Sequence, residues 1–521
     1  MRQLKRHLPE PYYKPFPVLL AAALLLSACA TPLKPEPQPE SFALPPDPTA
    51  AQWEPLWSNL PTTETTSWFD VQDVGPDALR WRLALVDTAT ISLDAQYFIW
   101  RDDAVGSLLL ERLLWAADRG VRVRLLLDDS FLAGEDQVLI AVDTHPKVEV
   151  RIFNPLQVRA DNMLVRYIKN LNDNARINHR MHNKLLIADS QVAVVGGRNI
   201  ANEYFGFNRD HNFRDFDVLV TGEVLPQITS SFDTYWNSKW AFPVASVNHR
   251  HGTQEGLNRL RGKLRANAAT LDGWIESVAA GTHDWAVQWA ALAPTMLPGK
   301  ATIHQDHPDI ADNLPQVQAA RQILGFLPQT ETDVVSISAY LIPTEDVLHT
   351  IDQLSQQDVR IKALTNSLAS NNHVAAHTAY RHRRKQLLEA GVELHELRPH
   401  APERALFEAP GFTADHIGLH AKILVLDKRL VFVGTLNADP RSLVLNTEVS
   451  LMIESPELAE AILGAFSTDF SPQNSWRVEL DENGKLTWHS SDGILDRQPA
   501  GSVWRRVGDF FIGLLPVDEQ M

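Results

Sequence analysis

Short apolar runs bounded by polar residues recur along the chain, and two of them lie within the same polar frame. One run follows His182 and Lys184, and the other follows His420 and Lys422. Runs of this length and composition are typical of buried strands. Because side chains alternate faces along a strand, each histidine points to the same side as its lysine. The pattern predicts two buried strands, each with an imidazole and an ammonium group side by side at its start.

The two frames share more than the histidine and the lysine. Each continues with an aspartate five residues after the lysine, then with a glycine and, three residues later, an asparagine. The matching residues are Asp189 and Asn199 in the first frame and Asp427 and Asn437 in the second. The same residue types at the same spacing indicate that the chain contains one unit twice.

Further strands precede each frame in the same order. Three are predicted in each copy, with helix-like segments between them, at residues 91–100, 121–129 and 148–155 and again at residues 334–343, 358–367 and 392–399. Strands that alternate with helices are typical of α/β sheets. We therefore expect two similar α/β halves, residues 75–245 and 315–475, each a mixed sheet flanked by helices.

The N-terminal segment has the pattern of a secretion signal. Basic residues precede an apolar run, residues 18–26, that is too short to span a bilayer but suits a signal-peptide core. The sequence LSAC, which ends at Cys29, resembles the lipobox of bacterial lipoproteins. The resemblance implies a signal peptide over residues 1–28 and a lipidated Cys29 that anchors the protein to a membrane facing the periplasm. Ala30 after the cysteine favours the outer membrane, and a signal anchor with an incidental cysteine is the alternative.

Three stretches lie outside the two halves. Residues 29–74 begin rich in proline and are predicted to be an extended tether behind the lipid anchor. Residues 246–314 look mostly helical and form either a packing connector, which we favour, or a substrate-facing insertion. Residues 476–521 contain a predicted hairpin around the Asn-Gly pair at 483–484. They end in an apolar tail, residues 502–516, which either docks on the core or rests on a membrane, with docking favoured.

Length, charge and cysteine content narrow the classes of function. A chain of 521 residues is long for a single core. A formal net charge of -16 and a pI near 5.6 argue against general nucleic-acid binding, although a local basic pocket for a phosphate stays open. The single cysteine excludes intramolecular disulfides and cysteine-based zinc sites.

The paired frames supply the groups that phosphate chemistry needs. One histidine can act as a nucleophile and the other as a general acid, which allows a two-step displacement. Two lysines supply fixed positive charge, and Asn199 and Asn437 supply uncharged donors. Stabilising charge on non-bridging oxygens is the main task in phosphoryl or phosphatidyl transfer. No acidic metal cluster is evident in the sequence, so we expect no cofactor and assign the role of a divalent ion to the lysines.

The doubled H-x-K-x4-D-x6-G-[GT]-x-N pattern resembles the phospholipase D superfamily, and the match covers nearly all of the chain after the tether. Finer details, among them DAQYFIWRDD, GVRVRLLLDD and LNADPRSLVLNTE, are similar to bacterial cardiolipin synthases, particularly those of the third type. The resemblance implies that the two halves abut about a pseudo-twofold axis and share one active site at their seam.

The resemblance also implies a division of labour between the histidines. His182 would attack the phosphorus of a donor phospholipid and form a phosphatidyl-histidine. His420 would protonate the leaving alcohol and then deprotonate the incoming acceptor. The phosphate oxygens would be held by Lys184, Lys422, Asn199 and Asn437.

Acidic residues are expected in two supporting roles. In the superfamily a carboxylate downstream of each frame orients a histidine, and the resemblance assigns this role to Glu448 in the second half and Asp217 in the first. Asp189 and Asp427 lie at the ends of buried strands. We expect them to position a loop and pair with a cation, and not to react.

Three functions compete on this basis. The first is membrane-associated cardiolipin synthesis by phosphatidyl transfer between two phospholipids, with phosphatidylglycerol as substrate and phosphatidylethanolamine as a second candidate. The second is a phospholipase D-type hydrolase of phospholipids or, less favoured, of nucleic acid, because water can replace the lipid alcohol. The third is an inactive membrane-tethered scaffold, against which the intact histidines and lysines argue. No nucleic-acid partner is expected, and the need for an accessory protein stays open.

Overall fold

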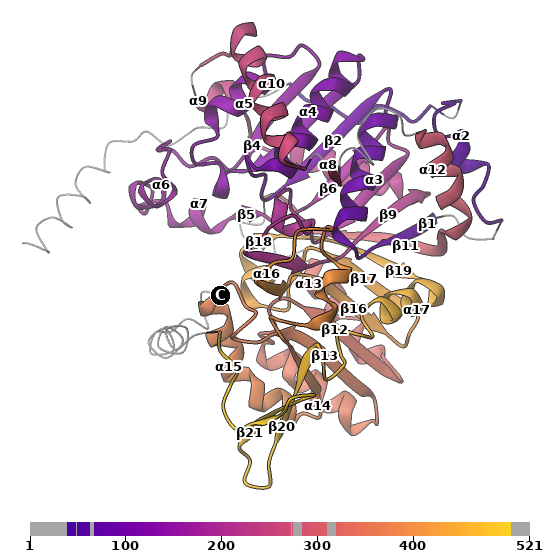
Figure 1. Ribbon diagram of the computed structural model, residues 1–521, viewed down its shortest axis with the longest axis vertical. Helices are drawn as coiled ribbons and strands as arrows, with labels where there is room; N and C mark the ends of the chain where they lie inside the picture. Colours follow the sequence, from indigo (N-terminus) through magenta and orange to yellow (C-terminus); the bar gives the residue numbers. More distant parts are fainter. Residues whose placement is uncertain are drawn as a thin grey trace, which may run out of the picture.

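The computed structural model describes residues 39–47, 49–62, 67–248, 250–271, 273–274, 284–309 and 319–501. The chain forms two α/β halves that abut, with the first half above the second in Figure 1. Within the described ranges, no helix has both the length and the apolar character needed to cross a bilayer. The predicted signal peptide, Cys29 and the tail at 502–516 lie outside the described residues.

The first half is built on a mixed sheet. Its strands are β1 (Ser67–Gln72), β2 (Ser92–Tyr97), β3 (Arg122–Asp128), β4 (Val148–Phe153), β6 (Leu185–Ala188), β7 (Val192–Gly196), β9 (Asp217–Gly222) and β10 (Ala241–Pro243). The order β10-β4-β3-β2-β6-β7-β9-β1 is parallel from β4 to β2 and antiparallel elsewhere. Its main helices are α3 (Gly75–Thr88), α4 (Ala104–Asp118), α5 (Asp136–Val142) and α8 (Leu225–Trp236).

The second half repeats this order. Its strands are β12 (Asp333–Ser338), β13 (Arg360–Asn366), β14 (Glu393–Leu397), β16 (Lys422–Leu426), β17 (Leu430–Gly434) and β19 (Val449–Glu454). The order β14-β13-β12-β16-β17-β19 matches β4-β3-β2-β6-β7-β9 strand for strand. Its main helices are α13 (Ala319–Leu324), α14 (Glu345–Gln356), α15 (Val374–Glu389) and α17 (Pro456–Ala465). The prediction of two α/β halves with matching strands is confirmed.

One strand joins the two sheets. In β11 (Leu297–Gln305), residues 297–299 pair with β1 and residues 300–305 pair with β19. A Cβ atom at Gly299 would lie 2.9 Å from Ile453 Cγ2 and 3.2 Å from Phe69 Cε2, so the switch between partners leaves room only for glycine. The sequence predicted a mostly helical connector over 246–314 and missed this strand.

The seam between the halves is itself a hydrophobic core. Its apolar side chains come from the facing sides of both sheets, such as Leu185 and Val218 in the first half and Ile423 and Leu451 in the second. Helices α8 and α17 close this core, whereas α3, α4 and α5 cover the opposite face of the first sheet. The halves are therefore held together by buried apolar area as well as by strand pairing.

Two predicted boundaries are wrong. The tether expected over 29–74 ends earlier, because Trp53 is fully buried against Trp289 and β1 lies within the first sheet. Arg124 and Arg151 also bind backbone carbonyls of Ser41 and Pro39. At the other end, the predicted hairpin is present as β20 (Ser475–Leu480) and β21 (Leu486–Ser490), but β20 pairs with β14 and so extends the second sheet beyond residue 475.

The connector packs on the first half. It contains α10 (Gln254–Ala268) and α12 (Trp285–Leu292), of which α10 lies against α4 and α12 against the short helix α2 (Glu54–Trp57). Buried leucines Leu257, Leu260 and Leu264 form the face of α10 that meets the first half. These contacts favour the packing role over a substrate-facing insertion.

Candidate active site

Two short parallel strand pairs cross the seam and bring the site together. β5 (Arg180–Met181) pairs with β18 (Asn446–Thr447), and β15 (His416–Leu419) pairs with β8 (His211–Arg214). In each pair, the residues that directly follow the strands are a histidine from one half and a carboxylate from the other. The backbone N–H groups of His182 and His420 donate to the carbonyls of Thr447 and Arg214 at 2.9 and 2.8 Å.

Each histidine is therefore held by a carboxylate of the opposite half. His182 Nδ1 is hydrogen-bonded to Glu448 Oε2 at 2.8 Å, and His420 Nδ1 is hydrogen-bonded to Asp215 Oδ2 at 2.6 Å. All four side chains are at least nine-tenths buried. A carboxylate on Nδ1 fixes the orientation of the ring and leaves Nε2 for chemistry. The pairing makes one site from two half-sites, as expected.

The carboxylate of the first half is Asp215, and the expected role of Asp217 is wrong. Asp217 lies in a buried ion-pair cluster with Arg82 at 2.8 Å and Arg198 at 3.0 Å. The sheet register explains the difference. Gly196 faces Asp217 and Gly434 faces Ser450, so Asp217 corresponds to Ser450, and the residues two positions earlier are Asp215 and Glu448. The carboxylate lies 19 residues after the frame glycine in the first half and 14 residues after it in the second, so the sheet register, and not spacing along the sequence, identifies Asp215.

The use of Asp in one half and Glu in the other follows from a local difference in space. A Cβ atom on Gly197 would lie 2.2 Å from Asp215 Oδ1, so the short aspartate reaches its histidine directly over a bare glycine. In the second frame Thr435 stands in that place and exchanges hydrogen bonds with the backbone of Val449. The longer side chain of Glu448 spans the additional distance.

The two lysines are buried beside the histidines. Lys184 Nζ donates to the carbonyl of His182 at 2.5 Å, and Lys422 Nζ lies 3.0 Å from His420 Nδ1. Burial lowers the pKa of Lys184 to about 7 and that of Lys422 to about 8. Each lysine lacks a carboxylate within ion-pairing distance among the described residues, so their charge is available to an anion.

The same environment disfavours charge on the histidines. Burial, together with the positive charges of Lys184 and Lys422, holds the pKa of His182 well below its usual value. Burial and Lys422 likewise lower the pKa of His420 to about 3, although Asp215 works in the opposite direction. Each histidine is affected by the lysine of the opposite half, which places all four groups in one site. A phosphate bound among them would relieve this repulsion.

The two asparagines differ in their surroundings. Asn199 Oδ1 accepts a hydrogen bond from the backbone N–H of Ile99 at 3.0 Å, which positions its amide. Asn437 is 5 % exposed, and its Oδ1 has no partner within the part of the chain that the structure describes. Buried amides normally find partners. Both asparagines therefore lie at the site, each just after the strands of its frame. Among the described residues, Asn437 Oδ1 has no hydrogen-bond partner there.

The frame aspartates hold loops and do not face the histidines. Asp189 accepts hydrogen bonds from the backbone N–H groups of Thr90, Ile91 and Ser92 at 2.8 to 3.0 Å. Asp427 accepts equivalent bonds from residues 331–333. The expected loop-positioning role agrees with these bonds. The expected pairing with a cation is wrong, because within the described ranges backbone amides occupy both carboxylates and neither forms a salt bridge.

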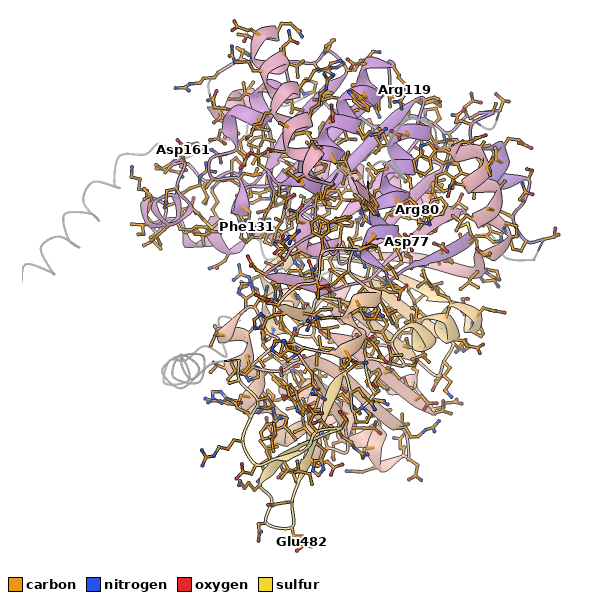
Figure 2. The ribbon with its side chains drawn as sticks, in the orientation of Figure 1. Asp77, Arg80, Arg119, Phe131, Asp161 and Glu482 are labelled. Atoms are coloured by element: carbon orange, nitrogen blue, oxygen red, sulfur yellow. The ribbon has the colours of Figure 1, made fainter. Side chains whose placement is uncertain are left out.

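Aromatic rings pack against each histidine. Phe98 contacts the His182 ring at 5.0 Å between centroids and is itself packed edge-on against Phe131, which Figure 2 labels on the first half. Tyr204 and Phe213 contact the His420 ring at 5.1 Å each. These rings exclude water from the imidazoles and restrict their rotation. No sequence pattern distinguishes these rings, because aromatic residues near a strand end are common in any core.

Two α/β halves that share one buried site of paired histidines and lysines define an enzyme of the phospholipase D superfamily. The model of the family described as "Cardiolipin synthase, PLD-like domain" matches residues 83–236 and 324–470. The chain is 36% identical to cardiolipin synthase C of Escherichia coli (strain K12) over 459 residues, which is 85% of this chain and 93% of that protein. The chain therefore belongs to the cardiolipin synthase, PLD-like domain family and is a phosphatidyltransferase of that superfamily.

Other similar proteins also match most of the chain. An uncharacterized protein of Helicobacter pylori (strain J99 / ATCC 700824) is 30% identical over 424 residues, 81% of this chain and 82% of its own. Among solved structures, the phosphatidylserine synthase of Haemophilus influenzae Rd KW20 matches with a TM-score of 0.52 at 14% identity. That match covers 78% of this chain and 87% of the other, and it supports the fold.

The assignment of Asp215 can be tested by a pair of isosteric substitutions. Asp215→Asn removes the charge that orients His420 and should lower phospholipid turnover by about 100-fold or more, the range typical of general acid–base catalysis. Asp217→Asn should lower the melting temperature, because it removes the charge that pairs Arg82 and Arg198. The protein that remains folded should turn over within a few-fold of wild type. A loss of turnover confined to Asp217→Asn would restore the original assignment.

The lowered lysine pKa values predict how anion binding depends on pH. Dimethyl phosphate, which carries one charge throughout this range, should bind tightest near pH 6. Its affinity should fall by about tenfold or more between pH 7 and pH 9, because each lysine that must regain a proton costs a factor of ten per pH unit above its pKa. Calorimetric titration at several pH values measures this loss. Lys184→Arg, which stays charged, should flatten the profile, and a flat profile in the wild type would contradict the electrostatic description.

Proposed function

We propose that the protein makes cardiolipin by moving a phosphatidyl group from one phospholipid to the headgroup alcohol of another, through a phosphatidyl group carried on His182. The observation that carries this proposal is the pairing of two imidazoles with carboxylates of opposite halves, at 2.8 and 2.6 Å, beside two buried lysines. Such a set can divide nucleophilic attack and proton transfer between its two histidines.

In the first step, His182 Nε2 attacks the phosphorus of the donor and forms a P–N bond. The P–O bond to the headgroup breaks, and His420 gives its proton to the departing oxygen. In the second step, His420 takes the proton of the acceptor hydroxyl while that oxygen attacks the phosphorus, and the P–N bond breaks. With two phosphatidylglycerols the products are cardiolipin and glycerol, and both histidines return to their starting states.

The charges around the phosphorus suit this sequence. Lys184 and Lys422 stabilise the non-bridging oxygens, where charge develops during transfer. Asn199 and Asn437 donate amide hydrogen bonds to the same oxygens. These donors are fixed before substrate arrives, because their strands belong to the two sheets, so little reorganisation accompanies the reaction.

The unequal carboxylates support the assignment of roles. Burial alone would raise the pKa of Asp215. The neighbouring His420 and Lys422 outweigh burial and lower this pKa well below its usual value, so the carboxyl group is ionised. Burial raises the pKa of Glu448 to about 7. An ionised Asp215 stabilises the imidazolium that an acid needs, so His420 suits proton transfer. The partly neutral Glu448 leaves His182 uncharged, as a nucleophile must be.

Expression in bacteria that lack their own cardiolipin synthases tests the reaction. The wild-type chain should restore cardiolipin, whereas His182→Ala and His420→Ala should each give none, with total lipids compared by mass spectrometry. Accumulation of phosphatidic acid without cardiolipin would show that water is the acceptor and would replace the proposal with the hydrolase. Phosphatidylethanolamine as donor would release ethanolamine instead of glycerol, which identifies the second lipid.

Membrane association is supported by an exposed apolar element close to the seam. The helix α6 (Met163–Lys169), which projects from the first half in Figure 1, exposes Leu164 at 68 % and Ile168 at 51 %. Tyr167 of this helix is close enough to Arg441 to influence the pKa of that guanidinium, so α6 lies near the short helix α16 (Pro440–Val444), which begins three residues after Asn437. We propose that α6 contacts the lipid surface and that a lipidated Cys29 anchors the chain to the outer membrane, facing the periplasm.

The anchor has a direct test. Cys29→Ser should block acylation and release the protein from the membrane fraction or stop its processing, as judged by fractionation and metabolic labelling with a fatty acid. The additional change Leu164→Asp should remove residual binding to phospholipid vesicles. Unchanged membrane fractionation and an unlabelled wild-type chain would together refute the lipid anchor.

A further inference from the structure

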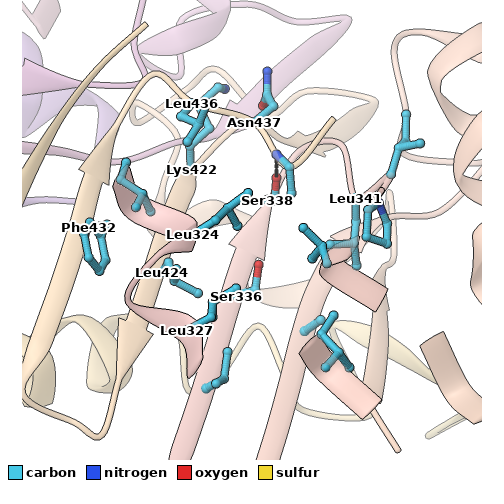
Figure 3. A pocket seen from close by; sticks show the side chains of 18 of the residues that line it. Leu324, Leu327, Ser336, Ser338, Leu341, Lys422, Leu424, Phe432, Leu436 and Asn437 are labelled. Atoms are coloured by element: carbon cyan, nitrogen blue, oxygen red, sulfur yellow. Dashed lines mark hydrogen bonds between the residues drawn. The ribbon is translucent and has the colours of Figure 1, made fainter. Parts of the chain in front are cut away.

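An apolar cavity adjoins the active site and extends into the second half. It has a volume of about 130 Å³ and lies between β12, β16 and β17 on one side and α13 and α14 on the other. Figure 3 shows Lys422 and Asn437 at the end nearest the first half, and Leu324, Leu327 and Phe432 further along. The cavity therefore has one polar end, formed by two groups of the phosphate site, and apolar walls beyond it.

The pseudo-symmetry of the fold shows that this space is specific to the second half. A β-bridge joins Trp100 to Ile200, the residue that follows the first frame, and the equivalent bridge joins Leu341 to Ala438, the residue that follows the second frame. The first pair is bulky, and the second is smaller at both positions. Both smaller residues line the cavity.

A third replacement lies next to the lysine. Ser338 of β12 pairs with Lys422, and the corresponding residue of β2 is Tyr97, which follows the pair formed by Gln96 and Leu185. Tyr97 is 1 % exposed and packs edge-on against Trp100 at 5.7 Å. In the first half, two aromatic rings therefore fill the space that is left open in the second half.

The walls restrict what the cavity can hold. The strand β12 contributes Ser336 and Ser338, and Ser338 Oγ already accepts a hydrogen bond from the backbone N–H of Ala438 at 3.3 Å. Most other wall positions are leucine, isoleucine, valine or alanine. A peptide or a sugar would bury polar groups there without partners, at a cost of about 1–3 kcal/mol each. A hydrocarbon chain would not.

We propose that this cavity binds an acyl chain of the phospholipid whose phosphate lies between Lys184 and Lys422. The inference rests on the proposed function for the phosphate end and adds the site for the apolar end. Burial of the chain would hold the donor while the headgroup leaves and the acceptor enters. It would also select donors by chain length, since each buried CH₂ contributes only as far as the cavity extends.

Alkylphosphonates test the cavity without turnover, because their P–C bond is not cleaved at the site. Methyl-, hexyl- and decylphosphonate are titrated calorimetrically against the wild-type chain. The affinity should rise by up to about fourfold per added CH₂, the fold-change that corresponds to about 0.8 kcal/mol. Ala438→Ile, which restores the residue of the first half, should reduce the gain from methyl to hexyl at least tenfold, because a cavity of about 130 Å³ holds about six carbon atoms. Ala286→Ile, at an exposed position of α12, adds the same bulk as a control.

A second variant covers the case in which Ala438→Ile does not fold. Leu341→Trp restores the other bulky residue of the first half and should have the same effect on the chain-length series. Equal gains with chain length in the wild type and in the folded variants would overturn the proposal. The chain-length series measures binding, so it can be interpreted even if no cardiolipin is made in cells. If cardiolipin is made but the affinity does not rise with chain length, only the proposal of an acyl-chain site is refuted.

Discussion

The site depends on the parallel pairing of short strands across the seam. β5 with β18 and β8 with β15 are only a few residues long, yet they set which carboxylate meets which histidine. A slip of one residue would turn Glu448 or Asp215 away from its imidazole, because side chains alternate along a strand. The sheets, the shared strand β11 and the apolar seam hold those short strands in register. Catalytic geometry and association of the halves are therefore one property of the fold.

Burial of the catalytic groups determines which of them carry a charge. Two lysines and two histidines share a region with two carboxylates, and water is excluded by aromatic rings such as Phe98 and Tyr204. The low dielectric disfavours a full set of charges, so the lysine pKa values fall and the histidines stay neutral. An incoming phosphodiester supplies the missing negative charge. Substrate binding and activation of the catalytic groups are coupled in this way, because the anion changes the protonation that the empty site prefers.

Much of this could be predicted from the sequence, because a repeated frame is a strong local signal. The strands, the two halves and the central histidines and lysines follow from apolar runs and spacing. Features that lie outside the repeated frame are harder to predict from the sequence. Asp217 was assigned from the resemblance, which implies only a carboxylate downstream of each frame, whereas the position of Asp215 follows from the pairing of β8 with β15 of the other half. β11 was missed because Pro298 and Gly299 interrupt its pattern, and its two partners are distant in sequence. The structural role of residues 39–47, 49–62 and 67–72 depends on contacts with residues distant in sequence, which no local pattern records.

The two copies are symmetric only where the chemistry requires it. Each half keeps its histidine and lysine, but the surroundings have diverged in complementary ways: Gly197 with the short Asp215, Thr435 with the longer Glu448. Tyr97 and Trp100 fill a space in the first half that Ser338 and Leu341 leave open in the second. A duplicated fold whose halves were identical would present two equivalent histidines and no preferred direction for a lipid. The differences around the shared phosphate position therefore make the surroundings of the two histidines unequal, which is what the proposed division between nucleophile and proton carrier requires.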